Sequence, residues 1–420
     1  MSRQSSEVFI DGAASKSQSR RILGATSLAH LFHDGATDMH YLLFAIWQQQ
    51  FGLSLAQVGL LKMLFSGAMS ALQIPAGELG RIAGEKKVLI GGTLLLTAAI
   101  FCYGFATTLP VLMGLIVLGG VGASVQHPLS SSYISQSFPR LQARLALSTY
   151  NFFGDVGKAI IPSALSALLL ITVWGHSVQL IAVSGLLIAG CLSGLLSSEK
   201  RLPKTMAPRP SASDDTATQT ADAGAPLFTE TQRKRAFASL CTIGSLDNAT
   251  RTGTLTFLPF LLASKGASAT QVGFALTVIF IGGALGKLVC GALAPRLGIL
   301  KTVAVSEIVT AGIILALTQI PLPAIYLLLV PLGIALNGTS SVLYGTVGEL
   351  AKPRRQTRAF AVFYTASLGC GAVMPLVYGL LGDRLGISHT LIVIAILLLC
   401  ILPLLLPLKV ITAQHHSPVG

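Results

Sequence analysis

Long apolar runs constrain this chain more than any other feature. A bilayer core about 30 Å thick needs about 20 apolar residues in each crossing helix, and the runs are continuous rather than alternating, which predicts helices and not barrel strands. Only 11% of the 420 residues are charged, against about 25% in a soluble protein, so the composition excludes a water-soluble globule. We predict an all-α integral membrane protein whose twelve transmembrane helices are roughly 22–47, 57–79, 87–105, 109–134, 145–171, 177–197, 236–263, 270–294, 299–319, 322–350, 357–382 and 387–411.

Segment 198–235 is the only long polar stretch between these runs. It holds prolines, Ser/Thr/Ala repeats and charges of both signs, a composition typical of a flexible linker. This interpretation divides the chain into an N-terminal six-helix bundle at 1–198, a cytoplasmic linker at 199–235 and a C-terminal six-helix bundle at 236–420.

The two bundles repeat each other at a constant offset of 214 residues. Gln57-Val58-Gly59 falls on Gln271-Val272-Gly273, and Pro139-Arg140 falls on Pro353-Arg354. Parallel repeats of six helices occur in transporters that hold their substrate near the middle of the membrane, between two pseudo-symmetric bundles. Shared helix-end chemistry is the alternative explanation of the matches.

The formal net charge of +13 gathers in one set of loops, for example at Lys86-Lys87 and Arg354-Arg355. The opposite loops near 48–56, 172–177 and 319–323 carry no Lys or Arg. This asymmetry predicts a multi-pass protein of the cell inner membrane with both termini in the cytoplasm. Since the charge is explained by topology, we expect no nucleic acid as a partner. The six cysteines show no CxxC spacing, so neither a disulfide framework nor a zinc site is indicated.

The loop after the second run carries a recognisable motif. Gly77-Glu78-Leu79-Gly80-Arg81-Ile82-Ala83-Gly84-Glu85-Lys86-Lys87 resembles the loop motif of the major facilitator superfamily, and Gly291 to Lys301, with Arg296, resembles its echo after the eighth helix. The resemblance covers essentially the whole chain and implies secondary transport by alternating access, with these residues at a cytoplasmic gate. The Asp that latches this gate in the family is Arg81 here, so Glu78 or Glu85 is expected to supply the charge. The pair Asp383-Arg384 after the eleventh helix is assigned to the same gate.

Two further motifs narrow the resemblance. Gly122-Ala123-Ser124-Val125-Gln126-His127-Pro128, and Gly154-Asp155-Val156-Gly157 with Pro162, resemble the fosmidomycin-resistance-like branch of exporters. The glycines of the fifth helix resemble the motif of the superfamily's antiporters, which favours export. The acidic residue that follows His-Pro in that branch is Leu129 here.

One face of the first helix is polar, with seven side chains inside an arc of about 160° at about 100° per residue. These side chains are His30, His33, Asp34, Thr37, Asp38, His40 and Tyr41. A charge at the bilayer centre costs at least about 2.5–3.5 kcal/mol, so such a face is expected to line a wet cavity. Asp34 and Asp38 are i,i+4 neighbours that should not both ionise easily, so one of them is expected to bind a proton. A permanently neutralised hydrogen-bonded cluster is the alternative.

The seventh helix carries Asp247 and Arg251 on one face. Pseudo-symmetry places Arg251 across the cavity from Asp38, and we expect a charge pair between them that forms in one access state and breaks in another. Protonation or an anionic substrate would compete for Arg251. Mutual neutralisation of Asp247 and Arg251, which are i,i+4 neighbours, is the alternative.

Three more ionisable residues are assigned to the same cavity. His127 precedes Pro128, which bends the fourth helix, so its ring could satisfy the kink, bind substrate or relay protons. Asp155 and Lys158 are i,i+3 neighbours and are expected to pair. Snorkelling or a local partner is expected for the residues that stand alone in their helices, Lys62, Lys287 and Glu307.

The sequence therefore favours a proton-coupled exporter of a small organic compound or drug, powered by the proton gradient and without a cofactor. Its expected partners are the substrate, protons and the lipid bilayer, and it is expected to act as a monomer. An uptake symporter is one alternative, and a transporter of a metal or metal chelate is another, because His and Asp are good divalent-metal ligands. No P-loop, GxSxG, HExxH or kinase motif occurs, so we expect no enzyme. A receptor without flux is the remaining class.

Overall fold

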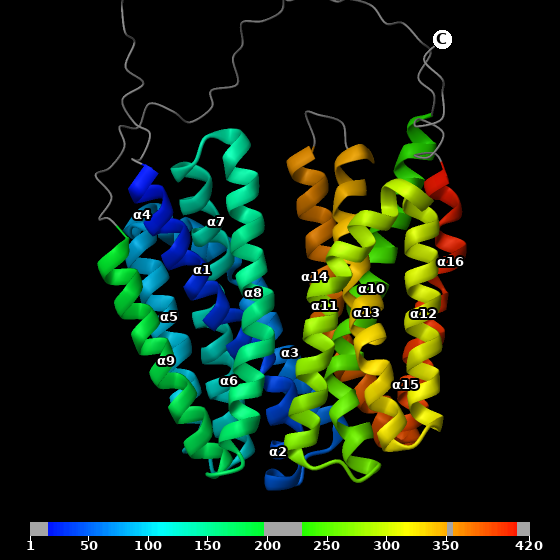
Figure 1. Cartoon of the computed structure of the whole chain (residues 1–420), viewed down its shortest axis with the longest axis horizontal. Coiled ribbons are helices and arrows are strands. Elements are labelled where there is room, and N and C mark those ends of the chain that lie inside the picture. Colours follow the sequence, from blue (N-terminus) through cyan, green and yellow to red (C-terminus); the bar gives the residue numbers. More distant parts are fainter. Residues whose placement is uncertain (1–15, 197–228, 351–355, 410–420) are drawn as a thin grey trace, which may run out of the picture.

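The computed structural model describes residues 16–196, 229–350 and 356–409, and every regular element in these ranges is a helix (Figure 1). We call 16–196 the N-terminal half and the rest the C-terminal half. The N-terminal half contains α1 (Lys16–Asp38), α2 (His40–Phe51), α3 (Leu55–Ala71), α4 (Gln73–Ala83), α5 (Glu85–Tyr103), α6 (Leu109–Ala123), α7 (Gln126–Ser137), α8 (Arg140–Leu168) and α9 (Trp174–Leu195). The C-terminal half contains α10 (Glu230–Ser264), α11 (Ala269–Leu297), α12 (Ile299–Gln319), α13 (Leu322–Leu350), α14 (Gln356–Leu385), α15 (Ile387–Leu399), α16 (Ile401–Leu404) and the short 3-10 helix η2 (Leu406–Leu408).

These helices form twelve passes, six in each half, when the broken passes α1–α2, α3–α4, α6–α7 and α15–α16 are each counted once. Among the described residues, up to nine passes are long and apolar enough to cross a membrane, if α3 and α4, which meet at a bend of 42°, count as one. The other three passes are α1–α2, α8 and α10, which carry most of the ionisable residues predicted for the cavity. The predicted all-α membrane fold is confirmed, and the passes that are least apolar are those with a polar face.

The two ends of the molecule are defined by the chain direction. One end holds the close of α9 and the start of α10, on either side of 197–228, and we call it the linker end; the opposite one is the far end (Figure 1). Because successive passes reverse direction, α1, α8, α10 and α14 start at the linker end, whereas α3 and α11 start at the far end.

Matching caps start α3 and α11. The Ser54 hydroxyl accepts from the backbone N–H of Gln57, whose side chain accepts from the backbone N–H of Ser54, and Ser268 and Gln271 make the same reciprocal pair. Such a capping box satisfies N–H groups that have no partner inside the helix. Ser54 and Ser268 are 214 residues apart, so the repeat seen in the sequence aligns equivalent helix starts of the two halves.

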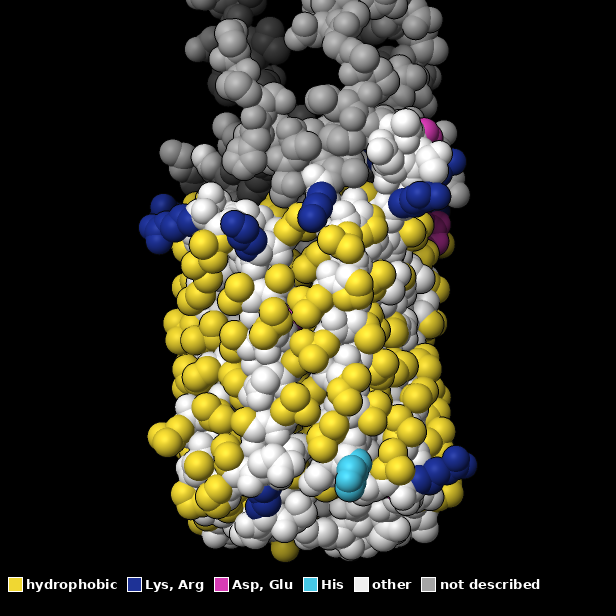
Figure 2. All heavy atoms as spheres, turned by 90° about the vertical axis from the view of Figure 1, so that its right-hand side faces the viewer, with side chains coloured by type: hydrophobic (Ala, Val, Ile, Leu, Met, Phe, Trp, Pro, Cys, Tyr) yellow, Lys and Arg dark blue, Asp and Glu magenta, His cyan; other side chains and the backbone are white. Residues whose placement is uncertain are grey.

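Apolar side chains cover the middle of the face shown in Figure 2. Lys and Arg side chains gather near the two ends of that face. Val305 and Ile308 on α12 and Ile396 on α15 are each about half exposed, whereas Trp47 and Phe257 are fully buried inside the halves. An apolar belt with cations at its edges fits a protein embedded in lipid.

The halves contact each other through α3 with α14 and through α8 with α11. On the first seam the backbones nearly touch, since a Cβ added to Gly59 would overlap the Pro375 carbonyl and one added to Gly379 would overlap the Leu55 carbonyl. Small residues permit this approach of membrane helices. On the second seam, the hydroxyl groups of Ser163 on α8 and Thr277 on α11 are 2.7 Å apart. Both seams lie toward the far end of the molecule.

Candidate functional site

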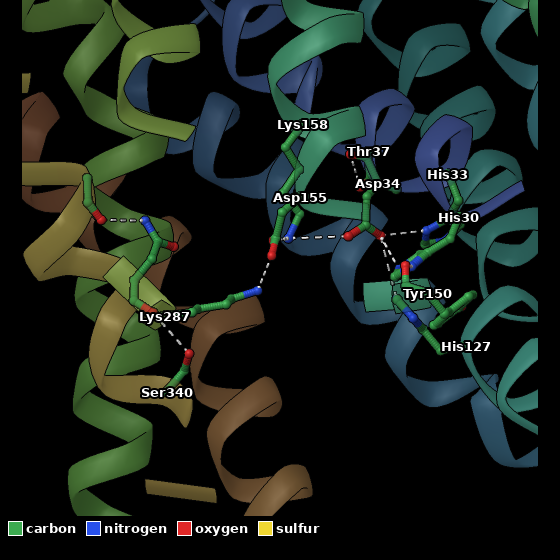
Figure 3. A network of polar contacts seen from close by, with 12 residues as sticks. His30, His33, Asp34, Thr37, His127, Tyr150, Asp155, Lys158, Lys287 and Ser340 are labelled. Atoms are coloured by element: carbon green, nitrogen blue, oxygen red, sulfur yellow. Dashed lines mark hydrogen bonds and ion pairs between the residues drawn. The ribbon is translucent and has the colours of Figure 1, made fainter. Parts of the chain in front are cut away.

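Asp34 on α1 is the centre of a cluster of basic side chains (Figure 3). His30 Nε2 lies 3.1 Å and His33 Nδ1 3.0 Å from its Oδ1 atom, and Lys158 Nζ on α8 lies 3.2 Å from Oδ2. His127 Nε2 on α7 lies 4.0 Å from Oδ1. The Asp34 side chain is only 11% exposed, so these basic groups stand in for the water that would solvate a carboxylate at the surface.

The His33 ring faces a hydrogen-bond acceptor on both sides. Its Nε2 is 3.0 Å from the carbonyl oxygen of Ala123, and its Nδ1 is 3.0 Å from Asp34 Oδ1. A neutral imidazole carries one N–H, and neither a carbonyl nor a carboxylate can donate. A neutral His33 ring can therefore donate to only one of its two acceptors. The His30 ring has Nδ1 2.8 Å from the carbonyl oxygen of Tyr150, whereas its Nε2, 3.1 Å from Asp34 Oδ1, makes no hydrogen bond to a described group.

Close packing of α8 on α1 holds this cluster together. Gly154 lies against His30 and Asp34, and Gly157 lies against the backbone of Leu31, so a Cβ at either position would overlap its neighbours. The glycine motif noted in the sequence thus has a packing role here. It lets the following turn of α8 bring its lysine to the Asp34 carboxylate.

Asp155 extends the cluster across the boundary between the halves. As expected, it contacts Lys158, with 3.4 Å between Oδ1 and Nζ, and its Oδ2 atom lies 2.5 Å from Nζ of Lys287 on α11. Snorkelling or a local partner was expected for Lys287, but its partner lies on the other half, where no local spacing can reveal it. Opposite charges therefore alternate from Asp34 through Lys158 and Asp155 to Lys287 (Figure 3). The two lysine side chains are 30% and 38% exposed, so a solute can reach this charge row.

Asp38 and Tyr41 follow Asp34 along the chain, and three helices supply cations near them. Lys62 Nζ on α3 lies 4.4 Å from the ring centroid of Tyr41, a cation–π contact. Asp38 is close enough to Lys158, Lys62 and Arg251 to interact with them electrostatically. The partner of Lys62 therefore lies on a neighbouring helix, α2.

Arg251 does not form either of the ion pairs considered from the sequence. Within 16–196, 229–350 and 356–409, no ion pair of 4 Å or less joins it to Asp38 or to Asp247. Its guanidinium group donates instead to the side-chain oxygen of Asn248. The i,i+4 spacing permits contact with Asp247, but the rotamers of two long side chains decide whether contact occurs.

Asp247 turns into the C-terminal half. The Thr339 hydroxyl on α13 donates to its Oδ1 atom at 2.7 Å, and the Glu307 side chain on α12 lies close enough to interact with it. The expectation that Glu307 is alone or has only a local partner is wrong, since its partner is on another helix.

His40 does not join the Asp34 cluster. It begins α2, and its Nδ1 lies 2.9 Å from the Thr37 carbonyl oxygen while its Nε2 lies 3.2 Å from the hydroxyl of Tyr103 on α5. The ring packs 4.5 Å from that of Phe65, in the aromatic interior of the N-terminal half. The helical projection fails here because α1 ends at Asp38 and the pass is broken before His40.

The loop motif lies at the linker end, as predicted. Arg81 makes a two-pronged hydrogen bond to Glu78 on its own helix, and Lys86 donates to the carbonyls of Ser193 and Leu196 at the end of α9. Gly84 has φ +97° at the turn between α4 and α5, a backbone conformation that favours glycine. The other predicted gate residues of this region, all at least partly exposed, are Gly77, Lys87, Gly291 and Arg296.

Glu85 has a different role from Glu78 at the same end. Its Oε1 atom accepts from the Ser132 hydroxyl at 2.6 Å and from the Gln136 amide at 3.4 Å, both on α7. Of the two acids offered as substitutes for the family's Asp, Glu78 pairs within α4 and Glu85 ties α5 to α7.

The assignment of Asp383 and Arg384 to this gate is wrong. They end α14, a pass that starts at the linker end, so they lie at the far end. The Asp383 carboxylate accepts from the backbone N–H groups of Leu55 (2.7 Å) and Ala56 (3.1 Å) in the first turn of α3. An acidic group of the C-terminal half therefore caps the N-terminus of α3 in the N-terminal half. The N-terminus is the positive end of the helix dipole.

Two residues of the cluster were missing from the prediction, Tyr150 and Lys287. The Tyr150 ring stacks on His30 with centroids 3.9 Å apart, and i,i+4 spacing from Gly154 was its only signal in the sequence. Lys287 was visible as a lone cation in an apolar run, where burial requires an acidic partner, but its pairing with Asp155 required the two halves to be placed together.

The comparisons with known proteins agree with this fold. The sequence profile of the Major Facilitator Superfamily matches residues 26–246 and 240–419. The chain is 24% identical to the D-galactonate transporter of Escherichia coli O6:H1, covering 83% of this chain and 85% of that protein. It is 26% identical to the fosmidomycin resistance protein of Escherichia coli K12, covering 46% and 49%.

A solved structure of a bacterial homolog of the human lysosomal transporter Spinster, in an inward-facing and occupied conformation, superimposes with a TM-score of 0.77. It is 15% identical and covers 97% of this chain and all of that one, so it supports the fold alone. The match of the family profile over both halves, together with this architecture, shows that the chain belongs to the Major Facilitator Superfamily of membrane transporters.

Proposed function

We propose that this chain is a proton-coupled transporter of a small organic anion, with His33 and Asp34 as the proton-binding groups. The observation that carries the proposal is the His33 ring, which lies between two acceptors and beside the charge row. Lys158 and Lys287, both partly exposed, offer the cations that an anion needs. Similarity to a transporter of D-galactonate, an organic anion, is in keeping with this substrate class.

The charges around Asp34 give the sign of the coupling. Ionised Asp34 holds Lys158 at 3.2 Å, and a proton on Asp34 removes that attraction and leaves Lys158 available to an anion. Proton and anion binding then strengthen each other, and this linkage is reciprocal. The geometry therefore favours movement of both in the same direction, that is, symport.

The Asp155–Lys287 pair connects binding to the movement of the halves. An anion bound at Lys158 and Lys287 competes with Asp155 for both lysines, and one of these contacts joins α8 to α11. Weakening the contact changes the relative stability of two access states, as alternating access requires.

The test is uptake into proteoliposomes under an imposed pH gradient, with labelled D-galactonate and a panel of carboxylates, sulfonates and phosphonates as probes. The unmodified protein should accumulate at least one anion, and Asp34→Asn should lose accumulation while it retains exchange of that anion across the membrane. Glu230→Gln, which removes an exposed carboxylate at the start of α10, is the matched control and should accumulate normally. Accumulation that survives in Asp34→Asn contradicts the proposed coupling site, and flux indifferent to the pH gradient makes the protein a facilitator.

A proton-antiporting exporter is the second candidate. The glycines at the α1–α8 contact resemble an antiporter motif, and about half of the chain is similar to a fosmidomycin resistance protein. Antiport requires the proton and the substrate to compete, so substrate binding should weaken at low pH, whereas symport predicts stronger binding. The dissociation constant of the transported compound at two pH values separates the two modes.

A divalent metal is a further candidate cargo. His30, Asp34 and His127 hold ligand atoms within 4.8 Å of one another, and imidazole and carboxylate are suitable ligands. Lys158 opposes a second cation beside Asp34. Calorimetric titration with Zn²⁺ and Mn²⁺ tests this candidate, which predicts binding that His127→Ala abolishes.

We also propose that the linker end faces the cytoplasm of a cell inner membrane. Exposed cations at this end include Arg81, Lys87 and Arg296, whereas Lys265 and Arg384 are at the far end, and cytoplasmic loops carry the excess of Lys and Arg. In a cysteine-free background, Lys87→Cys should react with a membrane-impermeant maleimide only in inverted vesicles, and His176→Cys only in right-side-out cells.

A further inference from the structure

Two buried carboxyl groups meet in the C-terminal half. Asp247 on α10 and Glu307 on α12 are 6% and 2% exposed, and their side chains lie close enough to interact directly. The Thr339 hydroxyl occupies Asp247 Oδ1 as a donor at 2.7 Å. Glu307 Oε1 is buried and has no hydrogen-bond donor within the described ranges.

Such a contact has a chemical requirement. Two ionised carboxylates cannot hydrogen-bond to each other, because neither has a donor, and two like charges in contact repel strongly in a medium of low dielectric constant. A proton on one of the carboxyl groups supplies the donor and removes the repulsion. Among the described residues, no group donates to Glu307 Oε1. A proton bound by the pair would provide such a donor.

The charges around the two carboxyl groups also favour one bound proton for the pair. The charged or titratable groups that act on the pair from the helices around it are Arg251 on α10 and Cys290 on α11. Arg251 is not within ion-pair distance of Asp247 and thus provides one positive charge at longer range. With one proton bound, the pair carries one negative charge instead of two.

We propose that Asp247 and Glu307 form a proton-binding site of the C-terminal half, in which one proton is shared between the two carboxyl groups and Thr339 holds Asp247 in position. The site draws on α10, α12 and α13, whereas the Asp34 cluster draws on α1, α7 and α8. Proton binding here does not depend on the substrate or the direction of transport proposed above. Loss of the proton would place two unshielded charges together, so α10 and α12 would have to move apart or admit another cation.

The test is pH-difference infrared spectroscopy of the purified full-length protein, which detects the carbonyl stretch of a protonated carboxyl group. The measurement is made on protein that carries Asp38→Asn as well as Asp34→Asn throughout, so that neither carboxyl group of α1 can contribute to the signal. A protonated-carboxyl band should be present, should titrate with pH and should be lost in Asp34→Asn/Glu307→Gln and in Asp34→Asn/Asp247→Asn. The matched control, Asp34→Asn/Glu78→Gln, also removes one carboxylate and should leave the band unchanged. A band that persists in both C-terminal variants overturns the proposal.

Three further measurements keep the outcomes distinct. Thr339→Val removes the donor but keeps both carboxyl groups, so it should shift the band without abolishing it, even if the other variants fail to fold. Disappearance of the band on addition of Na⁺ at constant pH would assign the site to a sodium ion and overturn the assignment to a proton. If transport is independent of the pH gradient but the band titrates, the proposed function is refuted and this site is not. If transport is coupled to protons but the band is absent, this site is refuted and the proposed function is not.

Discussion

At the scale of single residues, the carboxylates of this transporter differ in what neutralises them. Asp34 has three histidines and a lysine within 4.0 Å, and Asp155 has two lysines. Asp247 has a hydroxyl group and another carboxyl group instead. A buried charge is tolerated when it is paired, so these three sites should respond differently to pH and to substitution.

The first prediction concerns the pH dependence of anion binding. Lowering the pH should strengthen binding, because a proton on the His33–Asp34 pair releases Lys158 from its contact with Asp34. A tenfold change in the dissociation constant corresponds to about 1.4 kcal/mol, a coupling in the usual range for linked sites. Calorimetry of the transported anion at several pH values measures it. Asp34→Asn should bind the anion with little dependence on pH, and a pH profile unchanged from that of the parent contradicts the prediction.

The second prediction concerns the contact between the halves at Asp155 and Lys287. A double-mutant cycle with Asp155→Asn and Lys287→Met should give a coupling of about 1 kcal/mol, reduced by solvent screening because the lysine side chain is 38% exposed. Denaturant unfolding in detergent micelles provides the four stabilities. The same cycle on the fully exposed Glu78–Arg81 pair should show no measurable coupling, and additive effects at Asp155 and Lys287 would mean that their contact contributes nothing to stability.

At the scale of elements, the packing of α8 on α1 explains why a polar cluster can form inside a membrane protein. Glycines at 154 and 157 let the two helices approach until side chains of one touch the backbone of the other. The passes α1–α2, α8 and α10 fall short of the apolar character of the other passes. Burial of their polar faces against one another compensates for this, because polar groups in lipid need protein or water partners.

The third prediction uses two glycines of the N-terminal half. Gly157→Ala should destabilise the protein by about 1–3 kcal/mol, the range for overpacked sites, because the new methyl group would overlap the Leu31 carbonyl. Gly190→Ala is the matched control, since nothing lies within 4 Å of a Cβ added there. In thermal unfolding of the solubilised proteins, the midpoint temperature of Gly157→Ala should be lower than that of the parent, and that of Gly190→Ala should be equal or higher. Equal midpoints for the two variants would show that α1 and α8 can separate without loss.

At the scale of the whole molecule, the described contacts between the halves concentrate from mid-depth to the far end. The α3–α14 seam joins them through backbone contacts at Gly59 and Gly379, and Asp383 adds two hydrogen bonds to the first turn of α3. Alternating access requires this seam to open in another state. Asp383 is therefore placed to stabilise the state seen here over a state that is open at the far end.

The fourth prediction tests this contact as a latch. Asp383→Ala should shift the equilibrium toward opening of the far end by about 0.5–2 kcal/mol, the usual effect of losing a helix cap. A population change of roughly fivefold accompanies each kcal/mol. His176 and His389 are exposed on opposite halves. Electron–electron double resonance between spin labels at these positions should show a larger population of the longer distance, which belongs to the state that is open at the far end. Arg384→Ala, the neighbouring exposed residue, serves as the control, and an unchanged distance distribution in Asp383→Ala refutes the latch.

Of the contacts expected within one helix, those of Asp34 and Asp155 occur, whereas the Asp247–Arg251 pair of α10 does not. Asp34 meets His30 because residues four apart share a face of α1, and Asp155 meets Lys158, three residues on, for the same reason. Arg251 makes neither expected ion pair, although its position on a polar face of α10 was predictable. His40 is lost from the cluster because α1 and α2 are separate helices.

By itself, the sequence determined the all-α membrane fold, its family, the repeat of the halves and the helix faces that carry charge. These follow from the thickness of a bilayer and the period of a helix, which act on each apolar segment separately. Only the tertiary structure decided that Lys287 meets Asp155, that Glu307 meets Asp247 and that Asp383 caps α3. Each of these contacts joins passes that are distant in the sequence, and their distances depend on how whole helices pack, which no spacing within one helix encodes.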